Sequence, residues 1–178
     1  MLKGLKIHPS LEGRTLLGIV RNGDLLPWDH DVDISINSMD AERVLKLRYQ
    51  LLKLGYKLTV RKSTASHGPV RKGTCSVIKV KPLSRYLAYM VYPRASRRMV
   101  VMDVFIKYSD NQHTYWVAEG NVMRVEREHY DKCDYVTYKS KSLKVPAGYC
   151  GYLTKKYGSW NVEVRSWKCS RDEQTVVG

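Results

Sequence analysis

Residues 13–36 read GRTLLGIVRNGDLLPWDHDVDISI and carry most of the information that the sequence holds on fold and function. Alternate residues of a β-strand share one face, so Asp31 and Asp33 are predicted to point one way while Val32 and Ile34 point into a core. Carboxylates ~4 Å apart repel by roughly 4 kcal/mol at an effective dielectric constant near 20. Mg²⁺ or Mn²⁺, which prefer oxygen ligands, would relieve that repulsion.

An Asp-x-Asp pair is a weak signal by itself, because many solvated strand faces and turns contain one. The preceding residues strengthen it. Gly13 and Gly18 make the approach glycine-rich, and Asn22-Gly23 is typical of a turn. Pro27 disfavours the helical conformation for the residue before it, which favours an extended entry into the strand. Asp29 lies just ahead of the pair and is a further possible metal ligand.

The composition predicts one globular domain over residues 1–178. The chain is 43% hydrophobic and 27% charged, and no apolar run is long enough to span a membrane. Its first residues lack the apolar centre of a signal peptide, so work in a secretory compartment would require a targeting segment that this sequence does not include. The four cysteines form no C-x-x-C pair, which argues against a structural zinc site and leaves disulfides and free thiols both open.

Positive charge is concentrated in one block. Lys and Arg total 31 against 17 Asp and Glu, giving a net charge of +14, and residues 43–102 hold fifteen Lys or Arg and no acidic residue. We expect one wall of the protein to attract polyanions. Nucleic acid, phosphorylated glycan, anionic lipid and a nucleotide-linked substrate are candidate partners, and a solvated basic surface without a specific partner is the alternative.

The hydrophobic periodicity predicts a mixed α/β fold. Helices are expected over residues 15–21, from residue 37 or 38 to about 54, and from 146 to 157. Strands are expected over 31–36, 56–61, 74–81 and 99–106. We expect a loop over 63–73, a helix or strand over 85–92, an irregular region with two short strands over 110–145, and a frayed tail over 168–178.

Asp103 is unusual because the other residues of the strand predicted over 99–106 are apolar. An isolated buried carboxylate is costly unless it is paired or binds a metal. Two solutions are open. Asp103 forms a buried ion pair with one of the many arginines, or its strand lies beside residues 31–36 and Asp103 completes a site with Asp31 and Asp33. The second solution would hold one or two divalent ions over a nucleotide.

These motifs resemble the LicD–fukutin family of the nucleotidyltransferase superfamily. The family pattern is roughly GG[S/T]LLGxxR followed, after a few residues, by PWDxD-hydrophobic-D. Here residues 13–21 read GRTLLGIVR and residues 27–33 read PWDHDVD. Asp103 stands where the family has an Asp on a hydrophobic strand, and residues 145–158 resemble its closing helix. The resemblance spans about residues 12–160.

The resemblance implies a nucleotidyltransferase-like mixed sheet flanked by helices. It also implies transfer of a phospho-alcohol from a CDP-linked donor, CDP-ribitol or CDP-choline, to a sugar hydroxyl of a glycan or glycoprotein. By this resemblance Asp31 and Asp33 would hold Mg²⁺ or Mn²⁺, and Asp103 would complete the site or act as the base. The residues implied at the donor site are Gly13, Thr15, Gly18, Arg21 and Trp28.

Several points stay open beside the resemblance. Arg14 replaces the second glycine of the family pattern, which leaves the geometry of the donor site undecided. Arg21 either meets phosphate or pairs with Asp24, and Trp28 lies either at the site or in the core. The family's cysteine-rich zinc loop is not visible in this sequence.

The alternative functions are an inactive or truncated relative that serves as a binding module, and a basic protein that binds nucleic acid or transfers nucleotides. A fukutin-type member would work in the Golgi or secretory lumen, and a bacterial or viral LicD-type member in the cytoplasm. The alcohol, the acceptor and the oligomeric state are left undetermined.

Overall fold

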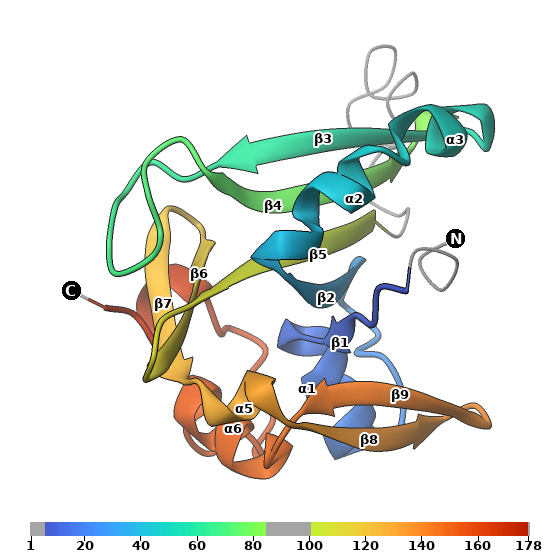
Figure 1. The fold of residues 1–178 in the computed structure, drawn as a ribbon. Helices are drawn as coiled ribbons and strands as arrows, with labels where there is room; N and C mark the ends of the chain where they lie inside the picture. Colours follow the sequence, from blue (N-terminus) through green and yellow to red (C-terminus); the bar gives the residue numbers. More distant parts are fainter. Residues whose placement is uncertain (1–5, 85–100, 178) are drawn as a thin grey trace.

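A mixed sheet and the helices around it make up residues 6–84 and 101–177, the part of the chain that the computed structural model describes (Figure 1). The seven strands of this sheet are β1 (Ser10–Leu11), β2 (Asp31–Asn37), β3 (Tyr56–Lys62), β4 (Cys75–Pro82), β5 (Val101–Ser109), β6 (His113–Ala118) and β7 (Asn121–Glu126). A separate two-stranded sheet contains β8 (Cys133–Tyr138) and β9 (Lys141–Pro146). The helices are α1 (Gly13–Asn22), the 3₁₀ turn η2 (Ser38–Asp40), α2 (Ala41–Leu45), α3 (Arg48–Lys53), α5 (Glu128–Asp131), α6 (Tyr149–Tyr157) and α7 (Cys169–Asp172).

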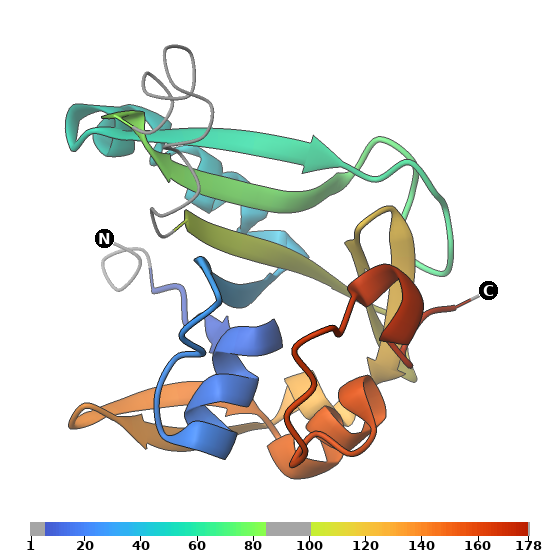
Figure 2. The same ribbon diagram turned by 180° about the vertical axis from the view of Figure 1, so that it is seen from behind.

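The main sheet has the strand order β1-β2-β5-β4-β3, with β6 paired to β5 and β7 paired to β6. β2 and β5 are parallel, and the other pairs are antiparallel. In Figure 1, η2, α2 and α3 lie across one face of the sheet; Figure 2 shows the opposite face, on whose side α1 and the C-terminal segment lie. The predicted mixed α/β single domain is confirmed, because one hydrophobic core includes buried residues of the sheet, α1 and α2.

The elements around the Asp-rich motif agree with the predictions. α1 begins after Glu12, whose carboxylate accepts a hydrogen bond from the backbone N–H of Gly13, and it ends at Gly23 in a left-handed conformation.

The four cysteines are free thiols, so the disulfide alternative is not found. Among the described residues, no helix is long and apolar enough to cross a bilayer. The segment 85–92 lies outside the described residues.

The single helix predicted up to residue 54 is wrong. The chain instead forms η2, α2 and α3, with a break at residues 46–47 where the N–H of Leu47 bonds to the carbonyl of Val44 in a tight three-residue turn. Val44 and Leu47 are buried as the periodicity predicted, whereas Leu54 is 62% exposed. Leu51, beyond the break, still packs partly against the core, so the stripe reaches solvent only at its last residue.

The region 110–145 is more regular than predicted, since it contains β6, β7, α5, β8 and β9. The hairpin between β8 and β9 turns at Lys139 and Ser140, which both have positive φ angles. Such turns usually contain Asn or Gly, so this pair gave no turn signal. Glu119-Gly120 forms the corresponding turn between β6 and β7.

The tail expected to fray over 168–178 is instead packed against the domain through its described residues. It contains α7, and the backbone N–H of Val177 donates to the carbonyl of Val122 on β7. Thr175 accepts a hydrogen bond at its carbonyl from the N–H of Arg124. These bonds extend the sheet at the edge of β7, a partner that the sequence of the tail does not reveal.

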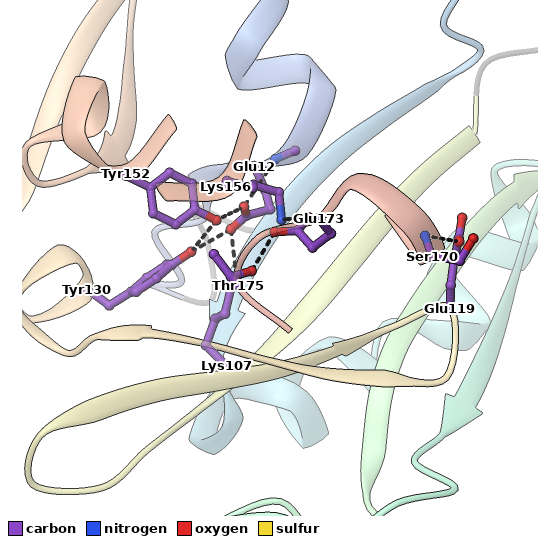
Figure 3. Close-up of polar contacts among 10 residues, drawn as sticks. Glu12, Lys107, Glu119, Tyr130, Tyr152, Lys156, Ser170, Glu173 and Thr175 are labelled. Carbon is purple, nitrogen blue, oxygen red and sulfur yellow. Dashed lines mark hydrogen bonds and ion pairs between the residues drawn. The ribbon is translucent and has the colours of Figure 1, made fainter. Parts of the chain in front are cut away.

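A buried polar cluster surrounds Glu12, directly before α1 (Figure 3). Its carboxylate accepts hydrogen bonds from the hydroxyls of Tyr130, at 2.6 Å, and Tyr152, and it lies 2.8 Å from the ammonium of Lys107. Burial alone would raise the pKa of Glu12, but the ammonium groups of Lys107 and Lys156 outweigh burial and lower the pKa to about 2. Glu12 is therefore held as a buried, charged carboxylate.

A second ion pair of this cluster joins α6 to the tail. The ammonium of Lys156 lies 3.0 Å from the carboxylate of Glu173, and both side chains are buried (Figure 3). Burial opposes the charge on Lys156, yet the neighbouring carboxylates raise its pKa above the ordinary value. The ring of Trp116 lies beneath both Lys156 and Lys107, with ammonium-to-centroid distances of 4.8 and 3.4 Å.

Lys156→Met should lower the free energy of unfolding by about 3–5 kcal/mol, because it leaves the buried carboxylate of Glu173 with the hydroxyl of Thr175 but without a cation. Lys155→Met is the matched control on the same helix. Lys155 pairs with Glu126, but both side chains are more than 40% exposed, so a loss within about 1 kcal/mol is expected. Urea unfolding of the two variants measures the difference, and equal losses would contradict a structural role for the buried pair.

Candidate metal centre and substrate cavity

Three carboxylates converge on one face of the sheet. Asp31 and Asp33 project from β2, and Asp103 projects from β5, where it stands directly opposite Asp33 in the parallel register. One ligand oxygen from each of the three lies within 4.8 Å of the others. Asp33 and Asp103 are buried, and Asp31 is half-buried. We refer to these three residues as the Asp triad.

Repulsion among the carboxylates of the triad favours the binding of a cation. Burial, together with the neighbouring carboxylates of Asp31, Asp29 and Asp103, raises the pKa of Asp33 to about 8. The Oδ1 atom of Asp103 is buried and has no hydrogen-bond partner among the described residues. Closely spaced carboxylate oxygens with free lone pairs are the ligand set that Mg²⁺ and Mn²⁺ prefer, so the residues present fit such an ion.

The structure places Asp103 beside Asp31 and Asp33 and also gives it an ion pair. Its strand lies beside β2, as the metal-site interpretation required. Its Oδ2 atom also forms an ion pair, but with Lys79 of β4 and not with an arginine. Lys79 is one of the fifteen basic residues in the block 43–102. The sequence does not predict its contact with the triad, because that contact depends on the pairing of β4 with β5.

Asp29 lies outside the Asp triad in the described structure. Its Oδ1 atom forms an ion pair at 2.8 Å with Arg14, the residue that replaces the second glycine of the motif. Burial raises the pKa of Asp29 to about 6 despite this pair. Arg14 thus pairs with the acidic residue next to the triad, and its half-exposed side chain lines a cavity that lies over the triad.

The start of α1 is packed against Asp33. Gly13 has a φ angle of +55°, and a Cβ atom there would lie 2.4 Å from the Oδ2 atom of Asp33, so a side chain would displace the carboxylate. The hydroxyl of Thr15 accepts a hydrogen bond from the backbone N–H of Asp33 at 2.8 Å. The N–H of Glu12 donates to the Asp33 carbonyl at 3.0 Å. Gly13 and Thr15 therefore position Asp33.

A cavity of about 760 Å³ lies over the triad. One wall comes from the ends of β3 and β4, and another from the segment 167–173 that precedes and includes α7. Its basic lining residues are Arg14, Arg61, Lys62, Lys79, Lys156 and Lys168. The cavity therefore combines an acidic cluster with cationic side chains, which suits a ligand that carries phosphate and a divalent ion.

Thr15, expected at the donor site, is buried against Asp33 and does not line this cavity. Three further residues expected there do not line it either. Gly18 is packed inside the domain, where a Cβ would lie 2.8 Å from the carbonyl oxygen of Asp24. Arg21 and Trp28 line a separate, small cavity of about 40 Å³. The guanidinium of Arg165 lies 5.0 Å from the Trp28 ring centroid. The structure thus places these residues away from the triad.

The pairing of Arg21 with Asp24 is not found. The guanidinium of Arg21 donates to the side chain of Asn22 and to backbone carbonyls of the segment 160–162. Asp24 instead accepts a hydrogen bond from the hydroxyl of Tyr138 and forms an ion pair with Lys139. The hairpin of β8 and β9 supplies these partners, and its proximity to α1 cannot be inferred from the motif.

Comparison with known proteins identifies related sequences. The family model described as "LicD/FKTN/FKRP, nucleotidyltransferase domain" matches residues 6–148. Ribitol 5-phosphate transferase FKRP from Mus musculus and from Homo sapiens are each 50% identical to this chain over 48 residues. That match covers 27% of this chain and 10% of each relative, so the chain corresponds to a small part of the curated relatives it matches.

Two solved structures show more distant similarity. The lincosamide antibiotic adenylyltransferase LnuA, bound to lincomycin, aligns with a TM-score of 0.48 and 15% identity over 85% of this chain and 77% of that chain. ANT(2″)-Ia in complex with adenylyl-2″-tobramycin aligns with a TM-score of 0.44 and 11% identity over 95% of this chain and 76% of that chain.

The family match extends over well more than half of the sequence and includes both strands that carry the Asp triad. This chain belongs to the LicD/FKTN/FKRP family of nucleotidyltransferase domains.

Proposed function

We propose that this chain is a divalent-metal-dependent phosphotransferase. It moves a phospho-alcohol, ribitol phosphate or phosphocholine, from a CDP-linked donor to a sugar hydroxyl of a glycan or glycoprotein. The observation that carries the proposal is the convergence of Asp31, Asp33 and Asp103 beside a large cavity with basic walls. Family membership supports transferase chemistry, and the donor, the acceptor and the metal belong to the proposal.

The Asp triad holds Mg²⁺ or Mn²⁺ in this proposal. The short spacing of the ligand oxygens and the free Oδ1 atom of Asp103 support this assignment. When bound, the ion neutralises phosphoryl oxygens and stabilises the charge that develops on the leaving phosphate. Asp29 is held by Arg14 and takes no part as a ligand.

The start of α1 supplies a second contact for the donor. The backbone N–H groups of Arg14 and Thr15 lie in the first turn, where helical hydrogen bonding leaves donors free. Such N–H groups and the helix dipole attract phosphate. Gly13 allows this turn to approach Asp33 closely, so phosphate and carboxylates are brought to the same place.

The reaction requires an aligned hydroxyl and a route for its proton. The acceptor oxygen forms a bond to the phosphorus that carries the alcohol, while the bond from that phosphorus to the CMP oxygen breaks. A triad carboxylate takes up the hydroxyl proton, and CMP leaves with the bridging oxygen. The side chains of Arg61 and Lys62, at the cavity wall, attract the anionic donor and help to orient it.

Mn²⁺ should stabilise the wild-type protein by about 2–3 kcal/mol at a concentration near one hundred times its dissociation constant, because the ion binds the folded state. Asp33→Asn should abolish this gain, since it removes a central ligand. Asp24→Asn, a substitution of the same type at an exposed carboxylate outside the triad, should retain it. Thermal unfolding with and without Mn²⁺ tests this prediction, and an equal gain in all three proteins would refute the metal site.

Transfer should appear as CMP release from CDP-ribitol or CDP-choline in the presence of Mn²⁺ and a glycan acceptor. Asp103→Asn should reduce the rate by about a hundredfold or more, because it removes both a metal ligand and a carboxylate near the acceptor. Chromatography of the nucleotide products measures the rate.

Three other outcomes would count against this function. Pyrophosphate release from a nucleoside triphosphate would indicate nucleotidyl transfer. Donor binding without CMP release from any acceptor would indicate a binding module. Tight RNA binding that depends steeply on salt and is unaffected by Asp33→Asn would indicate a nucleic-acid-binding protein.

A further inference from the structure

Lys79 occupies a distinctive position beside the Asp triad. It stands opposite Asp103 in the antiparallel pair of β4 and β5, while Asp103 stands opposite Asp33 in the parallel pair of β5 and β2. Lys79, Asp103 and Asp33 thus form one row across three neighbouring strands. All three line the cavity.

The ammonium of Lys79 binds one oxygen of Asp103 and leaves the other oxygen without a hydrogen bond among the described residues. Its side chain is 19% exposed, so it is partly enclosed but still reaches the cavity. A lysine at the end of a flexible four-carbon stem can change partners more easily than an arginine, whose planar group favours two fixed bonds to one carboxylate.

We propose that Lys79 is the internal counter-cation of the Asp triad, and that it exchanges Asp103 for a phosphoryl oxygen of the donor when a divalent ion binds. Before metal binding, its single charge limits the repulsion among the three carboxylates of the Asp triad. With a divalent ion present, that charge is no longer needed at Asp103. The inference rests on the metal site of the proposed function and assigns Lys79 as the counter-cation that the metal displaces from Asp103 and as a phosphate-binding residue for the donor.

The charges favour this exchange over two static alternatives. A divalent ion and one ammonium together neutralise three carboxylates, so Lys79 stays in the cavity without excess positive charge. If Lys79 remained on Asp103 throughout, the metal would have only the free Oδ1 atom of that carboxylate, beside an ammonium whose positive charge repels it. A role confined to packing the sheet would not account for an ammonium that lines the cavity and is directed at a triad carboxylate.

Calorimetric titration with Mn²⁺ near pH 8 tests the exchange in wild-type, Lys79→Met and Lys62→Met proteins. Lys79→Met should bind Mn²⁺ about tenfold more tightly, because a competing positive charge has been removed, while CMP release should fall about tenfold or more. Lys62→Met is the matched control. Lys62 lines the same cavity but has no ion pair with the triad in the part of the chain described, so its removal should change Mn²⁺ affinity less than about threefold.

A second measurement uses the wild-type protein and so does not depend on the folding of a variant. Acetic anhydride labelling, quantified by mass spectrometry, should modify Lys79 faster when Mn²⁺ is present, because its ammonium is released from Asp103. Lys141, which is exposed on β9 and does not line the cavity, provides the internal reference in the same sample. Addition of CDP-choline after Mn²⁺ should protect Lys79 again.

The outcomes separate the two proposals. Unchanged or weaker Mn²⁺ binding by folded Lys79→Met, or labelling of Lys79 that is insensitive to Mn²⁺, would overturn the exchange even if the wild-type protein releases CMP. Tighter binding and metal-dependent labelling without CMP release from any CDP-alcohol would support the exchange and refute the proposed donor. Absence of Mn²⁺ binding by the wild-type protein would overturn both.

Discussion

The parallel pairing of β2 and β5 is the constraint on which the site depends. Its register sets Asp33 directly opposite Asp103, and the alternation along β2 adds Asp31 on the same face. Like charges brought this close in a buried place oppose folding unless a cation offsets them. Lys79 supplies one positive charge, and the proposed divalent ion supplies the rest. The same register thus creates a repulsion that opposes folding and the place that the proposed cation would occupy.

A second layer of buried charge fixes the elements around the triad. Glu12 precedes α1, and its contacts with Lys107 and two tyrosine hydroxyls hold the helix start in place. Lys156 and Glu173 add the C-terminal segment to the same cluster, and this segment forms one wall of the cavity. The interior tolerates the cluster because each charge is paired. Removal of one charged partner lowers the free energy of unfolding, because the other charge stays buried without compensation.

The sequence was most informative where local rules apply. The alternation of Asp31 and Asp33 with apolar residues predicted the strand and its two faces, and the glycine-rich approach predicted α1. The same motif was less informative about individual side chains. Gly18 is required for close packing, and Arg21 and Trp28 face a different cavity, so membership in a motif did not place a residue at the site.

The sequence by itself determined the fold class, the family and the Asp pair, because strand alternation and motif spacing are properties of neighbouring residues. Tertiary structure decided the rest. Three features depend on the register between distant strands: the approach of Asp103 to Asp31 and Asp33, the cation that pairs with Asp103, and the docking of the tail. The sequence of one strand does not encode the register of its partner. Lys79 shows this directly: it was one basic residue among many until β4 paired with β5.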